Sequence, residues 1–280
     1  MRILITGGSG FFGRAFTKYA LQYELGTVCI YSRNEFNQFQ MRQDFKDDER
    51  IRWLIGDVRD RDRLRRAMEG VDQVIHAAAL KRIEVGAYNP TEMVKTNVVG
   101  TMNVIEAAMD AGVKKVVTLS SDKAYEPVSA YGHSKAMAES LTIAANNTTG
   151  SLGPLFAVTR YGNVAGSTGS VIPNWRKMIA EGKTTVPVTD PDCTRFWMSA
   201  NDAAQLVVTA FLNMKGGDMF IPHWLPAFRI SDLADAMGVA MQVNGLGGHE
   251  KKHESMDRGI TSDTARRMTV DEIREALKNV

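Results

Sequence analysis

Residues 3–13 read ILITGGSGFFG, an apolar run followed by three spaced glycines, and this stretch decides the fold. The run at 3–6 does not alternate between apolar and polar residues, which is typical of a parallel strand buried on both faces. Gly7 permits a tight turn, Gly10 allows a phosphate to approach the backbone, and Gly13 allows the next helix to pack on the strand. A strand, a glycine turn and a helix in this order predict a dinucleotide site at the N-terminus of the helix.

Strand and helix patterns alternate over the first 160 residues. The expected strands are 3–6, 27–31, 51–55, 71–76, 115–119 and 156–160, and the expected helices are 61–69, 90–111 and 130–145. This order predicts an α/β fold with a parallel sheet and helices on both faces, because right-handed crossovers place them there. Later elements are expected at 173–181, 201–212, 219–221, 231–237 and 270–277, with a mobile, glycine-rich loop at 244–253.

The composition excludes several classes of protein. The chain has 280 residues and a net charge of +2, so it lacks the basic surplus of a nucleic-acid-binding protein. No apolar run is long enough to cross a membrane or to act as a signal peptide. Two cysteines, Cys29 and Cys193, do not make a disulfide scaffold. We therefore expect a soluble, cytoplasmic protein of one large domain, or of a domain with a small appendage.

The end of the second expected strand bears on the choice of dinucleotide. Ser32 and Arg33 lie where enzymes that use NAD usually carry an acid. A hydroxyl and a guanidinium can instead bind a 2′-phosphate, the guanidinium through a charge-assisted hydrogen bond. These residues favour NADP and leave NAD open; the alternative is that Arg33 is only solvated. Asp57 and Val58 follow the third strand, where they are expected to hold the adenine amine and the ring edge.

A serine, a tyrosine and a lysine follow the strand expected at 115–119. Ser121 lies at its carboxyl end, where open parallel sheets bind ligands. Tyr131 and Lys135 are four residues apart on an expected helix, so they share one face. The ammonium is expected to lower the pKa of the tyrosine, which can then take a proton from a sugar hydroxyl while a nicotinamide takes the hydride. The alternative is a Tyr–Lys pair on an exposed helix face.

Several motifs resemble those of the extended short-chain dehydrogenase/reductases of the nucleotide-sugar branch, in particular the UDP-N-acetylglucosamine 4,6-dehydratases. The motifs are the glycine loop, His76-Ala77-Ala78-Ala79-Leu80-Lys81, Tyr88-Asn89-Pro90, Lys95-Thr96-Asn97, Ser121-Asp122-Lys123-Ala124, Tyr131-Gly132-His133-Ser134-Lys135, Arg160-Tyr161-Gly162-Asn163-Val164 and Thr194-Arg195-Phe196-Trp197. The resemblance is to the inverting type, which makes the pseudaminic acid precursor, because retaining relatives often carry methionine where Tyr131 stands. It covers residues 1–240, with a looser similarity beyond.

The resemblance implies a Rossmann-type doubly wound parallel sheet with a small C-terminal α/β substrate-binding region. Residues 1–162 would form the NADP-binding domain, with parts of 195–215 packing back on it, and residues 163–280 would mainly bind substrate. The implied cofactor site consists of Gly7, Ser9, Gly10, Phe11, Phe12, Gly13, Ser32, Arg33, Asp57, Val58, Ala77, Ala78, Ala79, Lys81, Asn97, Tyr131 and Lys135. Asn97 is also expected to brace the helix that carries Tyr131.

The same resemblance implies a lyase that eliminates water across C5 and C6 after transient oxidation at C4. Asp122 would be the acid for the departing C6 hydroxyl, and Lys123 the base for the C5 proton. A lysine base needs a lowered pKa, which burial or neighbouring Lys135 can supply, and a carboxylic acid at neutral pH needs the opposite shift. The alternative for Asp122 and Lys123 is a surface ion pair at the strand end.

Lys81, Asn163 and Arg195 are the residues expected to contact a UDP-sugar. A guanidinium can clamp a phosphate with two hydrogen bonds or stack on uracil. Lys81 is equally consistent with a solvated loop lysine. Arg195 has a structural alternative, which is an ion pair with Asp190, Asp192 or Asp202.

Residues 247–254 depart from the family pattern. Relatives usually carry Arg-Pro-Gly-Glu-Lys there, with an arginine that binds the diphosphate, whereas this chain has no arginine or proline in the segment. Lys251 or Arg258 can substitute for it. The acids and histidines of this segment superficially resemble metal ligands, but a charged loop explains them better, and no metal is expected.

Three functions compete. The first is a 4,6-dehydratase with C5 inversion. The second is a UDP-sugar 4-epimerase or ketoreductase, which uses Tyr131 and Lys135 but has no need for Asp122 and Lys123. The third is a catalytically silent dinucleotide-binding regulator, which would keep the glycine loop and lose the tyrosine or the lysine. The resemblance also implies a homo-oligomer, with the helices at 90–111 and 130–145 as interface elements.

Overall fold

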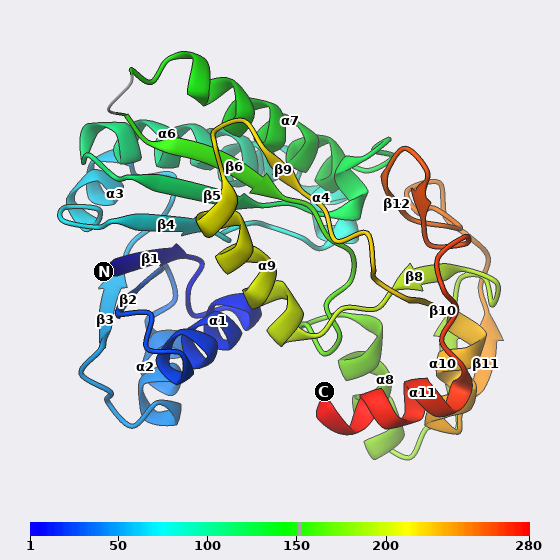
Figure 1. The fold of residues 1–280 in the computed structure, drawn as a ribbon. Helices are drawn as coiled ribbons and strands as arrows, with labels where there is room; N and C mark the ends of the chain where they lie inside the picture. The colour runs from blue at the N-terminus through cyan, green and yellow to red at the C-terminus, as the bar shows by residue number, and fades with distance from the viewer. Residues whose placement is uncertain (151–152) are drawn as a thin grey trace.

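The computed structural model describes residues 1–150 and 153–280. Its centre is a seven-stranded parallel sheet with the strand order β3-β2-β1-β4-β5-β6-β9 (Figure 1). The strands are β1 (Arg2–Thr6), β2 (Thr27–Ser32), β3 (Ile51–Ile55), β4 (Gln73–His76), β5 (Lys115–Leu119), β6 (Leu155–Thr159) and β9 (Met219–Phe220). This arrangement confirms the predicted α/β, doubly wound fold class.

Helices cover both faces of the sheet (Figure 1). On one face lie α1 (Phe11–Gln22), α2 (Glu35–Asp44) and α9 (Ala200–Asn213), and on the other lie α3 (Arg61–Ala67), α6 (Gly100–Asp110) and α7 (Ala130–Ala144). The sheet is apolar on both faces, so each layer of helices buries its own core. Phe16, Val207 and Phe211 belong to the first core, and Leu64 and Val104 to the second.

The helix expected at 90–111 is continuous along the chain but not uniform. It consists of α5 (Pro90–Met93), a π-helical segment at Val94–Val99, and α6. Such wide turns in an α-helix often mark functional sites. This segment contains Asn97, whose side chain forms hydrogen bonds with the loop after β4 and with α7.

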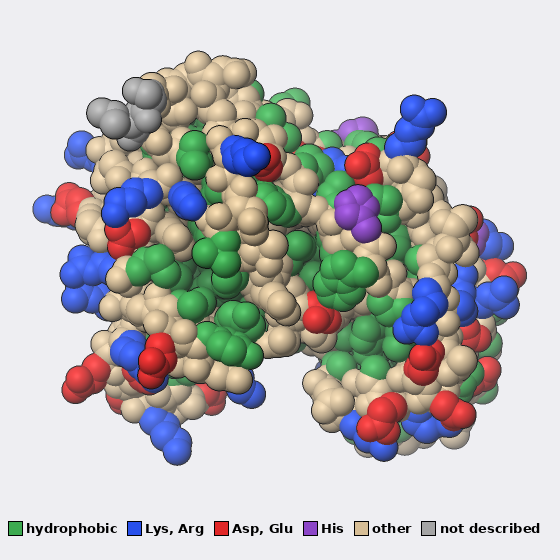
Figure 2. Space-filling model, in the orientation of Figure 1, with side chains coloured by type: hydrophobic (Ala, Val, Ile, Leu, Met, Phe, Trp, Pro, Cys, Tyr) green, Lys and Arg blue, Asp and Glu red, His purple; other side chains and the backbone are tan. Residues whose placement is uncertain are grey.

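The remaining elements form a smaller α/β part. They are α8 (Val171–Ala180), β7 (Thr185–Val188), β8 (Thr194–Phe196), β10 (Ala227–Arg229), α10 (Ile230–Met237), β11 (Ala240–Val243), β12 (Ser255–Asp257), β13 (Ile260–Thr261) and α11 (Val270–Ala276). Their core includes Trp175, Trp197, Phe228 and Ile273. The sequence prediction missed every strand of this part and also α2. Between the two parts the surface is hollowed, as Figure 2 shows.

Short elements complete the chain. They are α4 (Ile83–Tyr88) and the 3₁₀ turns at Asp122–Ala124, Ala145–Asn147 and Leu277–Asn279. Within residues 1–150 and 153–280, no helix is long and apolar enough to cross a membrane.

Candidate active site

A cleft of about 1820 Å³ runs along the carboxyl ends of the strands. One wall comes from the loops that follow β1, β2, β4, β5 and β6, and the other from residues 167–175 and 187–189 of the smaller part. Ligands of open parallel sheets bind at this edge. The volume is sufficient for a dinucleotide and a second nucleotide-sized ligand together.

The glycine loop leaves room for a ligand at the N-terminus of α1. Gly10 caps this helix without a side-chain hydrogen bond, and its first turn carries no acid, so the first N–H groups remain free for an anion. Gly7 has φ +67°, and a Cβ there would lie 2.8 Å from the Ala78 backbone. Gly13 does not line the cleft. A Cβ there would lie 2.1 Å from the Gly8 carbonyl oxygen, so Gly13 serves the packing of α1 on the loop.

At the end of β2, Ser32 and Arg33 both line the cleft. The Ser32 hydroxyl accepts a hydrogen bond from Gln38 Nε2 at 2.9 Å, and Arg33 Nη1 lies 3.7 Å from Asp57 Oδ2. Asp57 does not line the cleft, and its carboxylate is also paired with Arg59 at 2.7 Å. Burial opposes the ionisation of Asp57, but the hydrogen bonds from Arg59 and the charge of Arg33 outweigh it and lower its pKa. Its neighbour Val58 does face the cleft.

The loop after β4 supplies the next stretch of wall. Ala77, Ala78, Ala79 and Lys81 line the cleft, and burial, Arg82 and Lys123 lower the pKa of Lys81. Asn97 does not line it. The Asn97 side chain accepts from the Leu80 N–H and donates to the Leu80 carbonyl and to Ser134 Oγ, each within 2.9 Å. Asn97 therefore ties this loop to α7, the helix that carries Tyr131.

Tyr131 and Lys135 both face the cleft from the first turns of α7, which Ser129 caps. The expected lowering of the tyrosine pKa is wrong: burial raises the pKa of Tyr131, and the cation that opposes this is Lys123 rather than Lys135. The Lys135 ammonium instead donates to the Leu119 carbonyl. Burial lowers the pKa of Lys135 to about 8.

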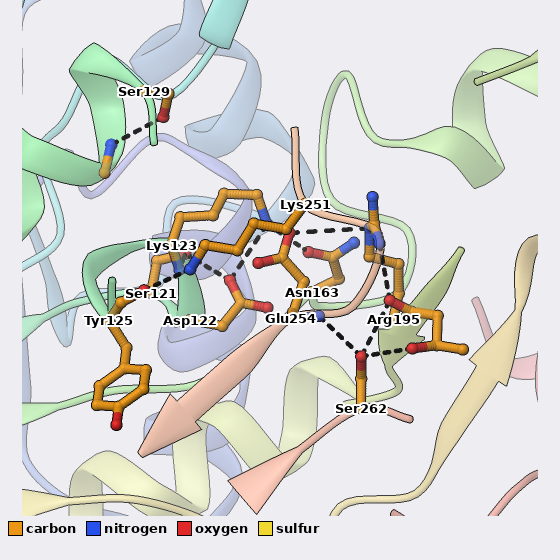
Figure 3. A network of polar contacts seen from close by, with 12 residues as sticks. Ser121, Asp122, Lys123, Tyr125, Ser129, Asn163, Arg195, Lys251, Glu254 and Ser262 are labelled. Atoms are coloured by element: carbon orange, nitrogen blue, oxygen red, sulfur yellow. Dashed lines mark hydrogen bonds and ion pairs between the residues drawn. The ribbon is translucent and has the colours of Figure 1, made fainter. Parts of the chain in front are cut away.

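Ser121, Asp122 and Lys123 form a tight turn at the end of β5 (Figure 3). Ser121 Oγ lies 2.9 Å and Lys123 Nζ 3.2 Å from Asp122 Oδ1. Ser121 and Lys123 line the cleft, whereas Asp122 is fully buried behind them. The pair is therefore not a surface ion pair. Burial, reinforced by the charge of Glu254, raises the pKa of Asp122, which is the direction that a carboxylic acid at neutral pH requires.

The expectation of a lowered pKa for Lys123 is wrong. Burial alone would lower it, but Asp122 and Glu254 both lie against the ammonium and raise the pKa of Lys123 above its usual value. The sequence did not predict the presence of Glu254 at this place. The structure thus holds Lys123 as a cation.

Asn163 and Arg195 stand beside Lys123 and line the same cleft (Figure 3). Asn163 Oδ1 lies 3.4 Å from Lys123 Nζ. The alternative ion pairs of Arg195 with nearby aspartates are not what the structure contains. Its Nε lies 3.9 Å from Glu254 Oε1, and its Nη1 donates to the carbonyls of Thr194 and Lys252.

The segment expected to be a mobile loop packs partly against the site. Within 244–253, the Lys251 ammonium donates to the Tyr125 carbonyl, and Glu254, which directly follows this loop, is only 2% exposed. Arg258 is exposed and lines neither the cleft nor the smaller pocket beside it, so it does not replace the missing family arginine. In the part of the chain that the structure describes, no three histidine, cysteine or acidic side chains are grouped to hold a metal ion.

Sequence reasoning missed several residues of the site. Arg82, Gly162, Ser167, Asn174 and Thr189 line the cleft, and Glu254 contacts Lys123 from behind. Arg82 adjoins the Lys81 motif, which was a usable signal. Gly162 lies within the motif at 160–164, and Asn174 lies in α8. Ser167, Thr189 and Glu254 lie in loops without a local pattern.

One cleft contains a glycine loop before α1, a serine at a strand end, and a tyrosine and a lysine one helical turn apart. Together with the fold, this site defines the class of protein, which is an extended short-chain dehydrogenase/reductase. A family described as "Polysaccharide biosynthesis protein" matches residues 3–274, and the chain belongs to this family.

Individual relatives place the chain more closely. It is 47% identical over 264 residues to the UDP-N-acetylglucosamine 4,6-dehydratase (inverting) of Campylobacter jejuni, covering 93% of this chain and 78% of the relative. It is 40% identical to the UDP-glucose 4-epimerase of Rickettsia akari, covering 91% and 76%. The X-ray structure of Pen from Bacillus thuringiensis matches with a TM-score of 0.92 at 36% identity, covering 100% of this chain and 98% of that one.

Proposed function

We propose that the protein is a nucleotide-sugar 4,6-dehydratase that acts on UDP-N-acetylglucosamine and inverts C5. The observation that carries this proposal is the Asp122–Lys123 pair near the tyrosine of the cleft, in which Asp122 is buried and Lys123 lines the cleft. A ketoreductase or an epimerase needs the tyrosine and lysine of α7 but has no proton to remove from C5. The 47% identity to the inverting dehydratase of Campylobacter jejuni supports the same choice.

Different side chains of the protein carry out the successive proton transfers of the reaction. The glycine loop and the end of β2 would hold the dinucleotide, which supplies a hydride acceptor for C4 and afterwards a hydride donor for C6. Tyr131 takes the proton of the C4 hydroxyl, and Ser121 orients that hydroxyl. The charge of Lys123 and a hydrogen bond from Ser121 favour the ionised tyrosine, against its burial. A ketone at C4 then acidifies the C5 proton.

Elimination uses the pair at the end of β5. Lys123 lines the cleft and is the proposed base for the C5 proton, a role that requires its ammonium to release a proton first. Asp122 supplies a proton to the departing C6 hydroxyl through Ser121, because Asp122 itself is buried and Ser121 Oγ lies between it and the cleft. Lys81, Asn163 and Arg195 would bind the UDP-sugar, since all three line the cleft near Lys123.

The proposal is tested by incubating the protein with UDP-N-acetylglucosamine and NADP in deuterated water and following the sugar by NMR. Loss of the C6 hydroxyl with deuterium at C5 is the expected result. The relative from Rickettsia akari makes 4-epimerisation the second candidate. Inversion at C4 with C6 intact would favour that candidate and overturn the dehydratase. Cofactor binding without turnover of any UDP-sugar would favour a regulator.

We also propose NADP as the preferred dinucleotide. The residues Ser32-Arg33-Asn34 after β2 carry no acid, and the Arg33 side chain is about half exposed at the edge of the cleft. Arg33→Ala is expected to weaken NADP binding about tenfold or more and to leave NAD binding nearly unchanged, since a phosphate–guanidinium pair contributes about 1.5 to 3 kcal/mol. Calorimetry with both dinucleotides measures this. Arg42→Ala on α2 is the control, and equal losses for both dinucleotides would contradict the assignment.

Residues 1–162 are proposed to carry the cofactor and residues 163–280 mainly the substrate, with α9 packed back on the sheet. We also propose a homo-oligomer that forms through the helices at 90–111 and 130–145. Val94, Val99, Met102 and Met137 on these helices are 40% to 50% exposed, which is unusual for apolar side chains grouped on adjacent helices. Light scattering reports the mass, and a monomer at micromolar concentration would contradict this.

A further inference from the structure

His76 is a buried histidine to which the proposed reaction gives no role. It is the last residue of β4, is only 1% exposed and does not line the cleft, although Ala77 and Ala78 directly after it do. Its Nδ1 lies 2.8 Å from Thr6 Oγ1 at the end of β1, and its Nε2 lies 3.0 Å from Thr101 Oγ1 on α6. The ring therefore connects the ends of two strands to a helix that packs on the sheet.

The neighbouring contacts decide which ring nitrogen of His76 carries the hydrogen. Thr101 Oγ1 lies 2.6 Å from the Asn97 carbonyl, which can only accept, so the Thr101 hydroxyl donates its hydrogen there. Thr101 must then accept from His76, and this places the ring hydrogen on Nε2. Nδ1 is left as an acceptor, and the Thr6 hydroxyl donates to it. Thr6 Oγ1 in turn accepts from the Ala78 N–H at 3.3 Å.

The ring of His76 is neutral, as this arrangement requires. Burial, reinforced by the charge of Lys135 on α7, lowers the pKa of His76 to about 3. A protonated ring would carry a hydrogen on Nδ1 as well, and Nδ1 could then no longer accept from the Thr6 hydroxyl. A neutral ring with its hydrogen on Nε2 satisfies both hydroxyl groups at once and gives each hydrogen bond a single direction.

Asn97 continues this row of hydrogen bonds to α7. Its carbonyl accepts from Thr101, and its side chain donates to Ser134 Oγ at 2.9 Å. Ser134 Oγ donates to the Tyr131 carbonyl at 2.8 Å. Hydrogen bonds thus run from the cleft wall at Ala78, through the buried histidine, to the helical turn that carries the tyrosine.

We propose that His76, held with its hydrogen on Nε2, is a positioning residue for the oxidation of C4. The inference rests on the C4 oxidation step of the proposed function. Because the ring is sealed from the cleft, it acts only through the groups that it holds. The wall at Ala78 belongs to the proposed dinucleotide site, and Tyr131 takes the proton of the C4 hydroxyl. Hydride and proton leave the same carbon and its oxygen, so both groups must keep one geometry, and a displacement of about 1 Å can cost about a hundredfold in rate.

Nitrogen NMR of the protein with isotope-labelled histidine tests the tautomer. The chain has five histidines, and the signals of His76 are those that disappear in His76→Gln or shift in Thr101→Val. A protonated Nε2 and an unprotonated Nδ1 are expected, unchanged between about pH 5 and about pH 8, because the pKa of His76 lies well below this range. A hydrogen on Nδ1, or a ring that gains a proton in this range, would contradict the inference.

Thr101→Val and Thr101→Ser form a matched pair for the kinetic test. Valine keeps the shape of threonine without its hydroxyl, whereas serine keeps the hydroxyl. Thr101→Val is expected to slow C4 oxidation about tenfold to a hundredfold at saturating UDP-N-acetylglucosamine and to leave the affinity for NADP nearly unchanged. Thr101→Ser is expected to restore most of the rate. The absorbance change of the cofactor measures the oxidation, and calorimetry measures the affinity.

Thr142→Val is the control for the loss of a buried hydroxyl. Thr142 is also a fully buried threonine of a helix, and its hydroxyl donates to the carbonyl four residues earlier, that of Ala138, at 2.8 Å. This variant is expected to lower the melting temperature, as Thr101→Val does, and to leave C4 oxidation unchanged.

The outcomes separate this inference from the function beneath it. If Thr101→Val oxidises C4 at the wild-type rate, or if Thr101→Ser or Thr142→Val is equally slow, the hydrogen bonds of His76 are only structural, and the inference is overturned while the dehydratase stands. A wild-type protein that oxidises C4 of no UDP-sugar overturns both.

Discussion

Lys123→Ala is expected to abolish deuterium exchange at C5 and to slow dehydration about a thousandfold, since a positioned base contributes about 10² to 10⁴ in rate. Oxidation at C4 is expected to slow but to persist, because Ser121, Tyr131 and Lys135 remain while the cation that favours the ionised tyrosine is lost. The absorbance change of the cofactor on mixing with UDP-sugar measures that first step, and NMR in deuterated water measures the second.

Removing Lys123 also leaves Asp122 and Glu254 buried without their shared cation, and both are then expected to take protons. The melting temperature and the affinity for NADP are therefore measured together with activity. Lys114→Ala, which removes an exposed lysine paired with Asp72, is the control. A collapse of cofactor affinity in Lys123→Ala would show that the lysine is structural.

Tyr131→Phe is expected to stop the reaction at the oxidation of C4, one step before the elimination that Lys123→Ala stops. The change removes only a hydroxyl, so the fold and cofactor binding are expected to remain, while oxidation at C4 falls about a thousandfold or more. Because C5 is not acidified without the C4 ketone, deuterium exchange at C5 is expected to disappear as well. The two variants thus differ in one readout: C4 oxidation survives in Lys123→Ala and is lost in Tyr131→Phe.

The control for the tyrosine is Tyr88→Phe, because Tyr88 is 87% exposed on α4. This substitution is expected to leave every step of the reaction unchanged. Exchange at C5 that continues at the wild-type rate in Tyr131→Phe would contradict the role given to Tyr131. It would mean that another group accepts the proton of the C4 hydroxyl.

The central sheet was predictable because its signals are local. β1, β2, β5 and β6 are short apolar runs buried on both faces, and the glycine loop marks the first turn by spacing alone. The strands of the smaller part were not predictable, since two to four residues hold too little alternation to indicate a strand. α2 was missed because it buries only Gln38 and Met41 and shows no clear apolar face.

The sequence predicted which residues line the candidate site better than it predicted the pKa shifts of those residues. A serine at the end of one strand, and a tyrosine and lysine four residues apart on the helix that follows, predicted that Ser121, Tyr131 and Lys135 share one cleft, as the structure shows. The protonation of Lys123 depends on Glu254, which approaches from a hairpin near the other end of the chain. Local sequence gives no indication of that contact, and the pKa of Lys123 was therefore predicted in the wrong direction.

The central claim is that hydride leaves C4 and returns to C6 of the same sugar. UDP-N-acetylglucosamine deuterated at C4 tests this most directly, with the product examined by NMR. The expected product is a 4-keto-6-deoxy sugar whose C6 methyl carries the deuterium. Deuterium that stays at C4 of an epimerised sugar with an intact C6 hydroxyl would contradict the account.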